Sequence, residues 1–221
     1  MHCTNDFQAV MMDLDGTLLN TLDDLADSMN STLADLGFPV HELEKYRHFV
    51  GEGMESLVRR SLPDSVRTDS NLVSRCFEMM RRTYERNCNA KTHPYPGIPG
   101  LLDALTTRGL KMAVLSNKPH DFTQKAVAGF LSAWRFEAVM GERPSIPRKP
   151  DPYSALEIAK RLGVDPGCFL YLGDTAIDMK TANAAGMYAV GALWGFRGPE
   201  ELIAGGAKKL IAKPADLLEL L

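Results

Sequence analysis

Short apolar runs that end at polar or glycine positions recur along the chain and predict the strands of a parallel sheet. The first run covers residues 7–12, and later runs cover residues 111–116, 136–140, 169–173, 188–192 and 209–211. Segments with apolar residues at helical spacing separate the later runs, at residues 101–108, 122–130, 153–162, 179–185 and 200–204. This alternation favours the α/β class, with helices on both faces of the sheet and right-handed crossovers.

Residues 21–89 have a different pattern, in which apolar residues recur at helical spacing throughout. Helical stretches are predicted at residues 22–36, 41–49, 54–62 and 70–88, and a Pro/Gly stretch at 94–100 follows them. This block is inserted directly after the first strand. We therefore expect a Rossmann-like α/β core of residues 1–19 and 95–221. An all-helical cap of residues 20–94 would lie over the strand ends as a lid.

Composition and charge exclude several classes of partner. The formal net charge of the 221 residues is −3, so no basic surface for nucleic acid or an anionic membrane is indicated. The four cysteines contain no CxxC pair and predict no zinc site. The N-terminus does not resemble a signal peptide, and no run approaches the roughly 18 apolar residues of a membrane helix. We expect a cytoplasmic protein whose oligomeric state the sequence leaves open.

Two carboxylates, Asp13 and Asp15, stand one residue apart directly after the first apolar run. Strand side chains alternate, so residues 13 and 15 are expected to point the same way. Two acids on one side of a buried strand end repel each other and are costly to desolvate, which a divalent cation such as Mg²⁺ would offset. Gly16 allows a tight turn and Thr17 adds a hydroxyl. The alternative is an ordinary helix entry with an Asp cap.

Polar groups also follow two later strands. Ser116 and Asn117 come at the end of the run at 111–116 and offer hydrogen-bond donors for a phosphate oxygen. Lys149, beside Pro150, offers a fixed ammonium for a phosphoryl group or a carboxylate. The alternatives are a helix cap for Ser116 and a solvated loop for Lys149. The sequence does not decide whether Arg148 or Lys149 points inward.

A second acid pair, Asp174 and Asp178, follows the run at 169–173. Asp174 could complete an oxygen cage for a cation, and Asp178 lies one helical turn further along. Alone, these residues could be a helix cap and a surface acid. Because parallel strands bind ligands beyond their carboxyl ends, all these groups together predict one site at that edge of the sheet.

Four motifs in this order resemble those of the haloacid dehalogenase superfamily of phosphotransferases. They are Asp13-Leu14-Asp15-Gly16-Thr17, Ser116-Asn117, Lys149-Pro150 and Gly173-Asp174-Thr175-Ala176-Ile177-Asp178. The resemblance covers the whole chain, including a helical cap after the first motif. Within the superfamily, the phosphoglycolate phosphatase branch is the most similar, through Val50-Gly51-Glu52-Gly53, Leu57-Val58-Arg59-Arg60 and Ser116-Asn117-Lys118-Pro119.

The resemblance implies a role for each acid. Asp13 would be the nucleophile that forms an aspartyl-phosphate, and Asp15 the general acid and base. Mg²⁺ would be bound by the side chains of Asp13 and Asp174 and the backbone carbonyl of Asp15, with Asp178 in support.

The resemblance also implies the phosphate-binding groups. Ser116 and Lys149 would bind the transferring phosphoryl group, and further contacts are expected from Thr17, Asn117, Gly51 and Gly53. The expected activity is Mg²⁺-dependent hydrolysis of a small phosphorylated metabolite, 2-phosphoglycolate. Candidate cations for the substrate carboxylate are Arg47, Lys118 and Arg59, and Glu52 is expected to face solvent.

Other functions use the same motifs. A sugar-phosphate mutase similar to β-phosphoglucomutase, a pyrophosphatase or a nucleotidase would share the core and differ in the cap. A haloacid dehalogenase would lack an acid at position 15. A phospho-receiver signalling domain uses similar groups, but it is shorter and has no inserted helical lid.

Overall fold

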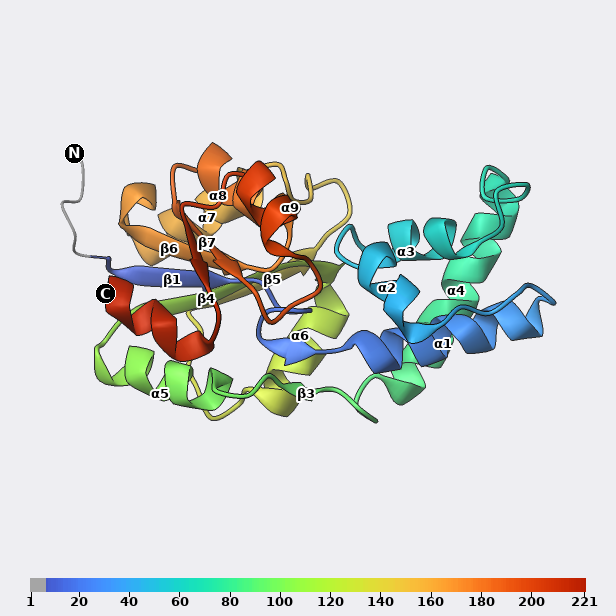
Figure 1. Ribbon diagram of the computed structural model, residues 1–221, viewed down its shortest axis with the longest axis horizontal. Helices are drawn as coiled ribbons and strands as arrows, with labels where there is room; N and C mark the ends of the chain where they lie inside the picture. The colour runs from blue at the N-terminus through green and yellow to red at the C-terminus, as the bar shows by residue number, and fades with distance from the viewer. Residues whose placement is uncertain (1–6) are drawn as a thin grey trace.

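The computed structural model describes residues 7–221, and its centre is a six-stranded parallel sheet (Figure 1). The strand order is β5-β4-β1-β6-β7-β8. The strands are β1 (Ala9–Met12), β4 (Lys111–Pro119), β5 (Ala138–Glu142), β6 (Phe169–Gly173), β7 (Tyr188–Ala192) and β8 (Lys209–Ile211). The α/β class and the parallel sheet predicted from the sequence are therefore confirmed.

Helices cover both faces of this sheet (Figure 1). One face is covered by α5 (Ile98–Thr107), α6 (His120–Phe130) and the 3-10 helix η2 (Pro214–Leu220). The other is covered by α7 (Tyr153–Leu162), α8 (Ala176–Ala184) and α9 (Pro199–Ala204), and a short 3-10 helix, η1 (Pro166–Cys168), precedes β6.

The central strand β1 contributes to both hydrophobic layers. Ala9 and Met11 pack in the cluster that includes α7, α8 and α9, whereas Val10 and Met12 pack in the cluster that includes α5 and α6. All four side chains are fully buried. A strand buried on both faces requires a continuous apolar run rather than an alternating one, which is the pattern seen here.

Four of the helices between β1 and β4 form a separate layer at one end of the sheet (Figure 1). They are α1 (Leu22–Asp35), α2 (Leu43–Phe49), α3 (Met54–Ser61) and α4 (Ser70–Asn87). Their buried apolar residues form their own cluster, which meets the rest of the protein at Phe122 and Phe196. None of the helices in residues 7–221 is long and apolar enough to cross a membrane.

The chain enters and leaves this helical layer through a small antiparallel sheet. Strands β2 (Leu19–Asn20) and β3 (His93–Pro94) pair side by side. These strands were not predicted, because two residues are too few to show a hydrophobic period. They lie beside the expected limits of the cap, and we propose residues 20–94 as the cap segment on this basis.

Some predicted boundaries differ from the observed ones by a few residues. The strand predicted at 136–140 is β5 at Ala138–Glu142, and the helix predicted at 179–185 begins earlier, at Ala176. The reason for the early start of α8 is a capping box, in which Thr175 and Asp178 each bond to the other's backbone N–H. This cap role of Asp178 is additional to the metal support that the family resemblance implies.

A buried acid, Asp24, fixes the return of the chain from the helical layer. It lies on α1, is 1% exposed, and accepts hydrogen bonds from the backbone N–H groups of Lys91 and Thr92 at 3.0 and 2.9 Å. The Thr92 hydroxyl donates a third bond at 2.7 Å. This carboxylate therefore holds together the two chain crossings between the layers.

We expect Asp24→Ala to lower the free energy of unfolding by about 3 kcal/mol, because it leaves buried donors without an acceptor. Asp27→Ala on the same helix is the matched control. It removes only an exposed ion pair with Lys91, so its effect should be much smaller. Urea unfolding of the two variants measures the difference, and equal losses would show that the buried bonds of Asp24 contribute little.

Candidate active site

Polar side chains from neighbouring strands meet at the carboxyl edge of the sheet. Asp13 follows β1, Ser116 lies near the end of β4, Lys149 follows β5, and Asp174 follows β6. All four are buried, with exposed fractions of 6% or less. The structure thus brings together groups that are far apart in the sequence, because these strands end at the same edge.

The Lys149 ammonium is the centre of this cluster. It donates to Asp13 Oδ1 at 2.8 Å, to Asp178 Oδ1 at 2.7 Å and to the Leu115 carbonyl at 3.0 Å. Burial by itself lowers the pKa of Lys149, but the carboxylates of Asp13 and Asp178 hold it well above its ordinary value. Arg148 instead contacts Glu142 and the Glu52 carbonyl, so Lys149 is the inward-pointing residue.

Three acids, Asp13, Asp174 and Asp178, place carboxylate oxygens within 4.8 Å of one another. The ammonium of Lys149 pairs with Asp13 and Asp178, so three carboxylates and one ammonium leave a formal excess of two negative charges. Burial raises the pKa of Asp13 to about 7, against the lowering effect of Lys149. Burial and the neighbouring Asp13 also raise the pKa of Asp174 well above its ordinary value.

Nearby donors hold these carboxylates in place. Asp174 accepts from the Thr17 hydroxyl at 2.8 Å and from the backbone N–H of Phe196 at 2.8 Å. Asp178 accepts from the Thr175 hydroxyl at 2.7 Å. Thr17 was predicted to contact phosphate, but its hydroxyl is directed at Asp174 and it does not line the cavity described below.

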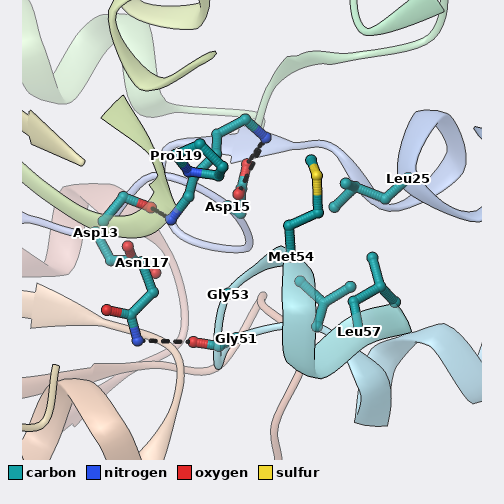
Figure 2. A pocket seen from close by; sticks show the side chains of 12 residues that line it. Asp13, Asp15, Leu25, Gly51, Gly53, Met54, Leu57, Asn117 and Pro119 are labelled. Atoms are coloured by element: carbon teal, nitrogen blue, oxygen red, sulfur yellow. Dashed lines mark hydrogen bonds and ion pairs between the residues drawn. The ribbon is translucent and has the colours of Figure 1, made fainter. Parts of the chain in front are cut away.

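Asp15 has partners different from those of Asp13. Both of its oxygens accept from the Lys118 ammonium, at 3.0 and 3.1 Å, and a dashed line at Asp15 marks this interaction in Figure 2. Lys118 also donates to the Tyr84 hydroxyl at 2.7 Å. Burial raises the pKa of Tyr84 to about 12, so its hydroxyl stays protonated. The cluster of Asp13, Asp174 and Asp178 described above does not include the Asp15 carboxylate. Tyr84 lies near the C-terminal end of α4, inside the helix predicted at 70–88, and no sequence signal pointed to it.

Asp13 and Asp15 line a cavity between the sheet and the helical layer (Figure 2). Its polar side contains Asp13, Asp15, Ser116, Asn117 and Lys118. Its other side is formed by apolar residues of the helical layer, with Pro119 beside them: Leu25, Val50, Met54 and Leu57.

Gly51 and Gly53 lie at the rim of the cavity, in the loop before α3. Asn117 connects this loop to Lys149, because its amide nitrogen donates to the carbonyls of Gly51 at 3.2 Å and Lys149 at 3.1 Å. Both glycines have positive φ, at 116° and 90°. The backbone at either position would be strained if the residue had a side chain. The loop can therefore adopt this conformation near the site only with glycine at both positions.

Of the three cations suggested for a substrate carboxylate, only Lys118 lines the cavity. Arg47 donates to the Gly195 carbonyl at 3.0 Å, and Arg59 pairs with Glu55 on the surface. Glu52 pairs with Arg60 and its side chain is 43% exposed, in agreement with the expectation that it faces solvent.

A family model described as haloacid dehalogenase-like hydrolase matches residues 10–192. The chain belongs to this family. The match covers the strands and loops that carry the four motifs, so the resemblance drawn from them is confirmed. The expectation that the protein is an enzyme is confirmed as well, because the family is one of hydrolases.

Individual relatives are similar over nearly the whole chain. The chain is 34% identical to a phosphoglycolate phosphatase of Nitrosospira multiformis, over 89% of this chain and 87% of that protein. It is 30% identical to a phosphoglycolate phosphatase of Aquifex aeolicus, over 97% and 96% of the two chains. A crystal structure of a predicted phosphoglycolate phosphatase from Haemophilus somnus matches with a TM-score of 0.90 and 26% identity, over 97% of each chain.

Gly195 is a position where the site depends on the absence of a side chain. A Cβ there would lie 2.3 Å from Asp174 Cβ and 2.5 Å from the Gly16 carbonyl oxygen. We expect Gly195→Ala to displace Asp174 and to lower the free energy of unfolding by about 2 kcal/mol.

Gly129→Ala on α6 is the control, because a Cβ at Gly129 meets no atom within 4 Å. It should stabilise the protein by about 0.5 kcal/mol, as expected for Gly→Ala at an unstrained position. Thermal or urea unfolding separates the two variants. A Gly195→Ala protein as stable as the wild type would contradict the close packing described above.

Proposed function

We propose that this protein is a Mg²⁺-dependent phosphatase that hydrolyses 2-phosphoglycolate to glycolate and phosphate. The observation that carries this proposal is the position of Asp13, a carboxylate at the cavity floor that is held by Lys149 beside two further acids. The relatives named above support the choice of substrate, because each bears the name phosphoglycolate phosphatase.

The acid cluster fits Mg²⁺ by its donor set. Asp13, Asp174 and Asp178 offer carboxylate oxygens, which hard divalent cations prefer, and their formal excess of negative charge is unbalanced by protein groups. We propose that Asp13 and Asp174 hold the ion with the backbone carbonyl of Asp15, and that Asp178 supports them. When bound, the ion would offset charge on the phosphoryl oxygens.

The proposed reaction has two steps. An oxygen of Asp13 attacks phosphorus while the bond from phosphorus to the substrate oxygen breaks, and Asp15 gives its proton to that departing oxygen. Asp15, now ionised, takes a proton from a water that attacks the aspartyl-phosphate, which releases phosphate and restores Asp13. Lys149 and Ser116 hold the transferring group, and the ammonium of Lys149 also keeps Asp13 in place.

The cavity wall favours a small substrate over a sugar phosphate. On the helical side it presents Leu25, Val50, Met54 and Leu57, which offer no side-chain donors or acceptors to sugar hydroxyls. The backbone of the loop at Gly51 and Gly53 is the proposed contact for the substrate carboxylate. A sugar-phosphate mutase, a pyrophosphatase and a nucleotidase are the alternatives that the experiment below separates.

Phosphate release with Mg²⁺ tests the proposal on 2-phosphoglycolate, β-glucose 1-phosphate, a nucleoside monophosphate and pyrophosphate. We expect kcat/KM for 2-phosphoglycolate to exceed that for the others by at least about tenfold, a margin typical of binding discrimination by a shaped pocket. Asp13→Asn should lower kcat more than about a thousandfold while the protein stays folded, as loss of a nucleophile does. Full activity of Asp13→Asn, or preference for another ester, would refute the assignment.

Metal binding is tested by a thermal shift that needs no turnover. The pKa of Asp13 is 3.8 ordinarily and about 7 in the fold, so the folded metal-free protein holds an extra proton in this range. The contribution of Asp13 to stability therefore falls as pH rises from about 4 to 7. Because Mg²⁺ binds the ionised carboxylates, the rise in Tm on adding Mg²⁺ should be larger at pH 8 than at pH 5.

Asp174→Asn should lose most of this Mg²⁺-induced shift at pH 8, whereas Asp64→Asn, at an exposed acid outside the cluster, should keep it. A shift of equal size at both pH values, or one that survives Asp174→Asn, would argue against a metal site at these acids.

A further inference from the structure

Lys118 is a buried cation whose donors are occupied by two protein groups. Its side chain is 3% exposed, and its ammonium contacts both oxygens of Asp15 and the hydroxyl of Tyr84. These contacts account for the donors of one ammonium group. Loss of a partner strongly destabilises a buried ammonium, so Lys118 is held in a fixed position between Asp15 and Tyr84.

Tyr84 is itself held rigidly. It lies on α4 in the helical layer, is 1% exposed, and its ring packs edge-to-face on Phe122 of α6 with a centroid distance of 5.2 Å. The Lys118 ammonium also lies 4.7 Å from the centre of the Tyr84 ring. Tyr84 therefore supports Lys118 through both its hydroxyl and its ring.

The geometry at Asp15 shows what this support can do. An ammonium that bonds to both carboxylate oxygens restricts rotation of the carboxyl group. A residue that must deliver a proton to a departing oxygen depends on such orientation. Asp13, which lines the cavity, already has its own cation in Lys149, so Lys118 is not needed for it.

We propose that Tyr84 is a positioning residue, which acts through Lys118 to set the orientation of Asp15 for proton transfer to the leaving oxygen. This inference rests on the proposed function, in which Asp15 is the general acid. Tyr84 does not line the cavity and touches no reacting atom. Since Tyr84 belongs to the helical layer, Asp15 is fully aligned only when this layer is seated on the sheet.

The test compares kcat/KM for three esters: 2-phosphoglycolate, ethyl phosphate and p-nitrophenyl phosphate. The two alkyl esters release an alkoxide that needs a proton, whereas p-nitrophenolate departs without one. The ratio kcat/KM covers only the steps through transfer of phosphorus to Asp13, so hydrolysis of the aspartyl-phosphate does not obscure the comparison.

General acid catalysis contributes about 10²- to 10⁴-fold, so partial misalignment in Tyr84→Phe should lower kcat/KM for both alkyl esters by about tenfold. For p-nitrophenyl phosphate the loss of kcat/KM should stay below about threefold, because general acid catalysis contributes little to the departure of p-nitrophenolate. Lys118→Met should show the same selectivity with a larger loss. The matched control is Tyr46→Phe, which removes another buried hydroxyl of the helical layer, one that bonds to Asn30 at 2.7 Å. This control variant should change kcat/KM for the three esters by the same factor.

Two results would overturn this inference and leave the proposed function intact. Equal losses for all three esters in Tyr84→Phe would show a packing role, and a loss confined to 2-phosphoglycolate would show that Lys118 and Tyr84 serve the substrate carboxylate. Asp15→Asn measured in parallel tests the proposed function. If Asp15→Asn is selective for alkyl esters and Tyr84→Phe is not, only the positioning role fails. If Asp15→Asn lowers all esters equally, the acid role fails and the inference with it.

Discussion

The buried ammonium of Lys149 is the interaction on which the rest of this site depends. It lies between Asp13 and Asp178 at 2.8 and 2.7 Å, and without it the buried carboxylates would repel one another with no cation from the protein. The three residues come from the loop after β1, the loop after β5 and helix α8. The ion pairs can therefore form only when the strands are in register, and assembly of the sheet also assembles the site.

The loops around Lys149 and Asp174 also form hydrogen bonds with the helical layer. Asn117 bonds to the backbone of Lys149 and to the Gly51 carbonyl. On the other side of the site, the backbone of Phe196 bonds to Asp174, and Arg197 bonds to the Val50 carbonyl at 2.9 Å. The polar floor and the apolar wall of the cavity are thus joined at two places. A change in the position of the helical layer would therefore also change the positions of the acids.

Each of the two neighbouring acids has its own lysine. Asp13 is paired with Lys149 and Asp15 with Lys118, although the acids stand only one residue apart. Separate cations suit the two tasks of the proposed reaction, in which one carboxylate stays ionised and the other exchanges a proton. Strand β1 ends at Met12, and the two side chains beyond it have different partners, Lys149 for Asp13 and Lys118 for Asp15.

The sequence by itself determined the parallel sheet, the inserted helices and the family, because strand period, strand ends and the order of the motifs are local properties of the chain. Convergence of the acids, Ser116 and Lys149 followed from the rule that parallel strands end at one edge. Only the tertiary structure decided which long-range partner each polar side chain takes. Tyr84 reaches Lys118 and Asp24 holds the residues before β3 because α4 and α1 pack in one particular way against their neighbours. Such contacts join segments whose local patterns are independent, so no hydrophobic period or motif could have predicted them.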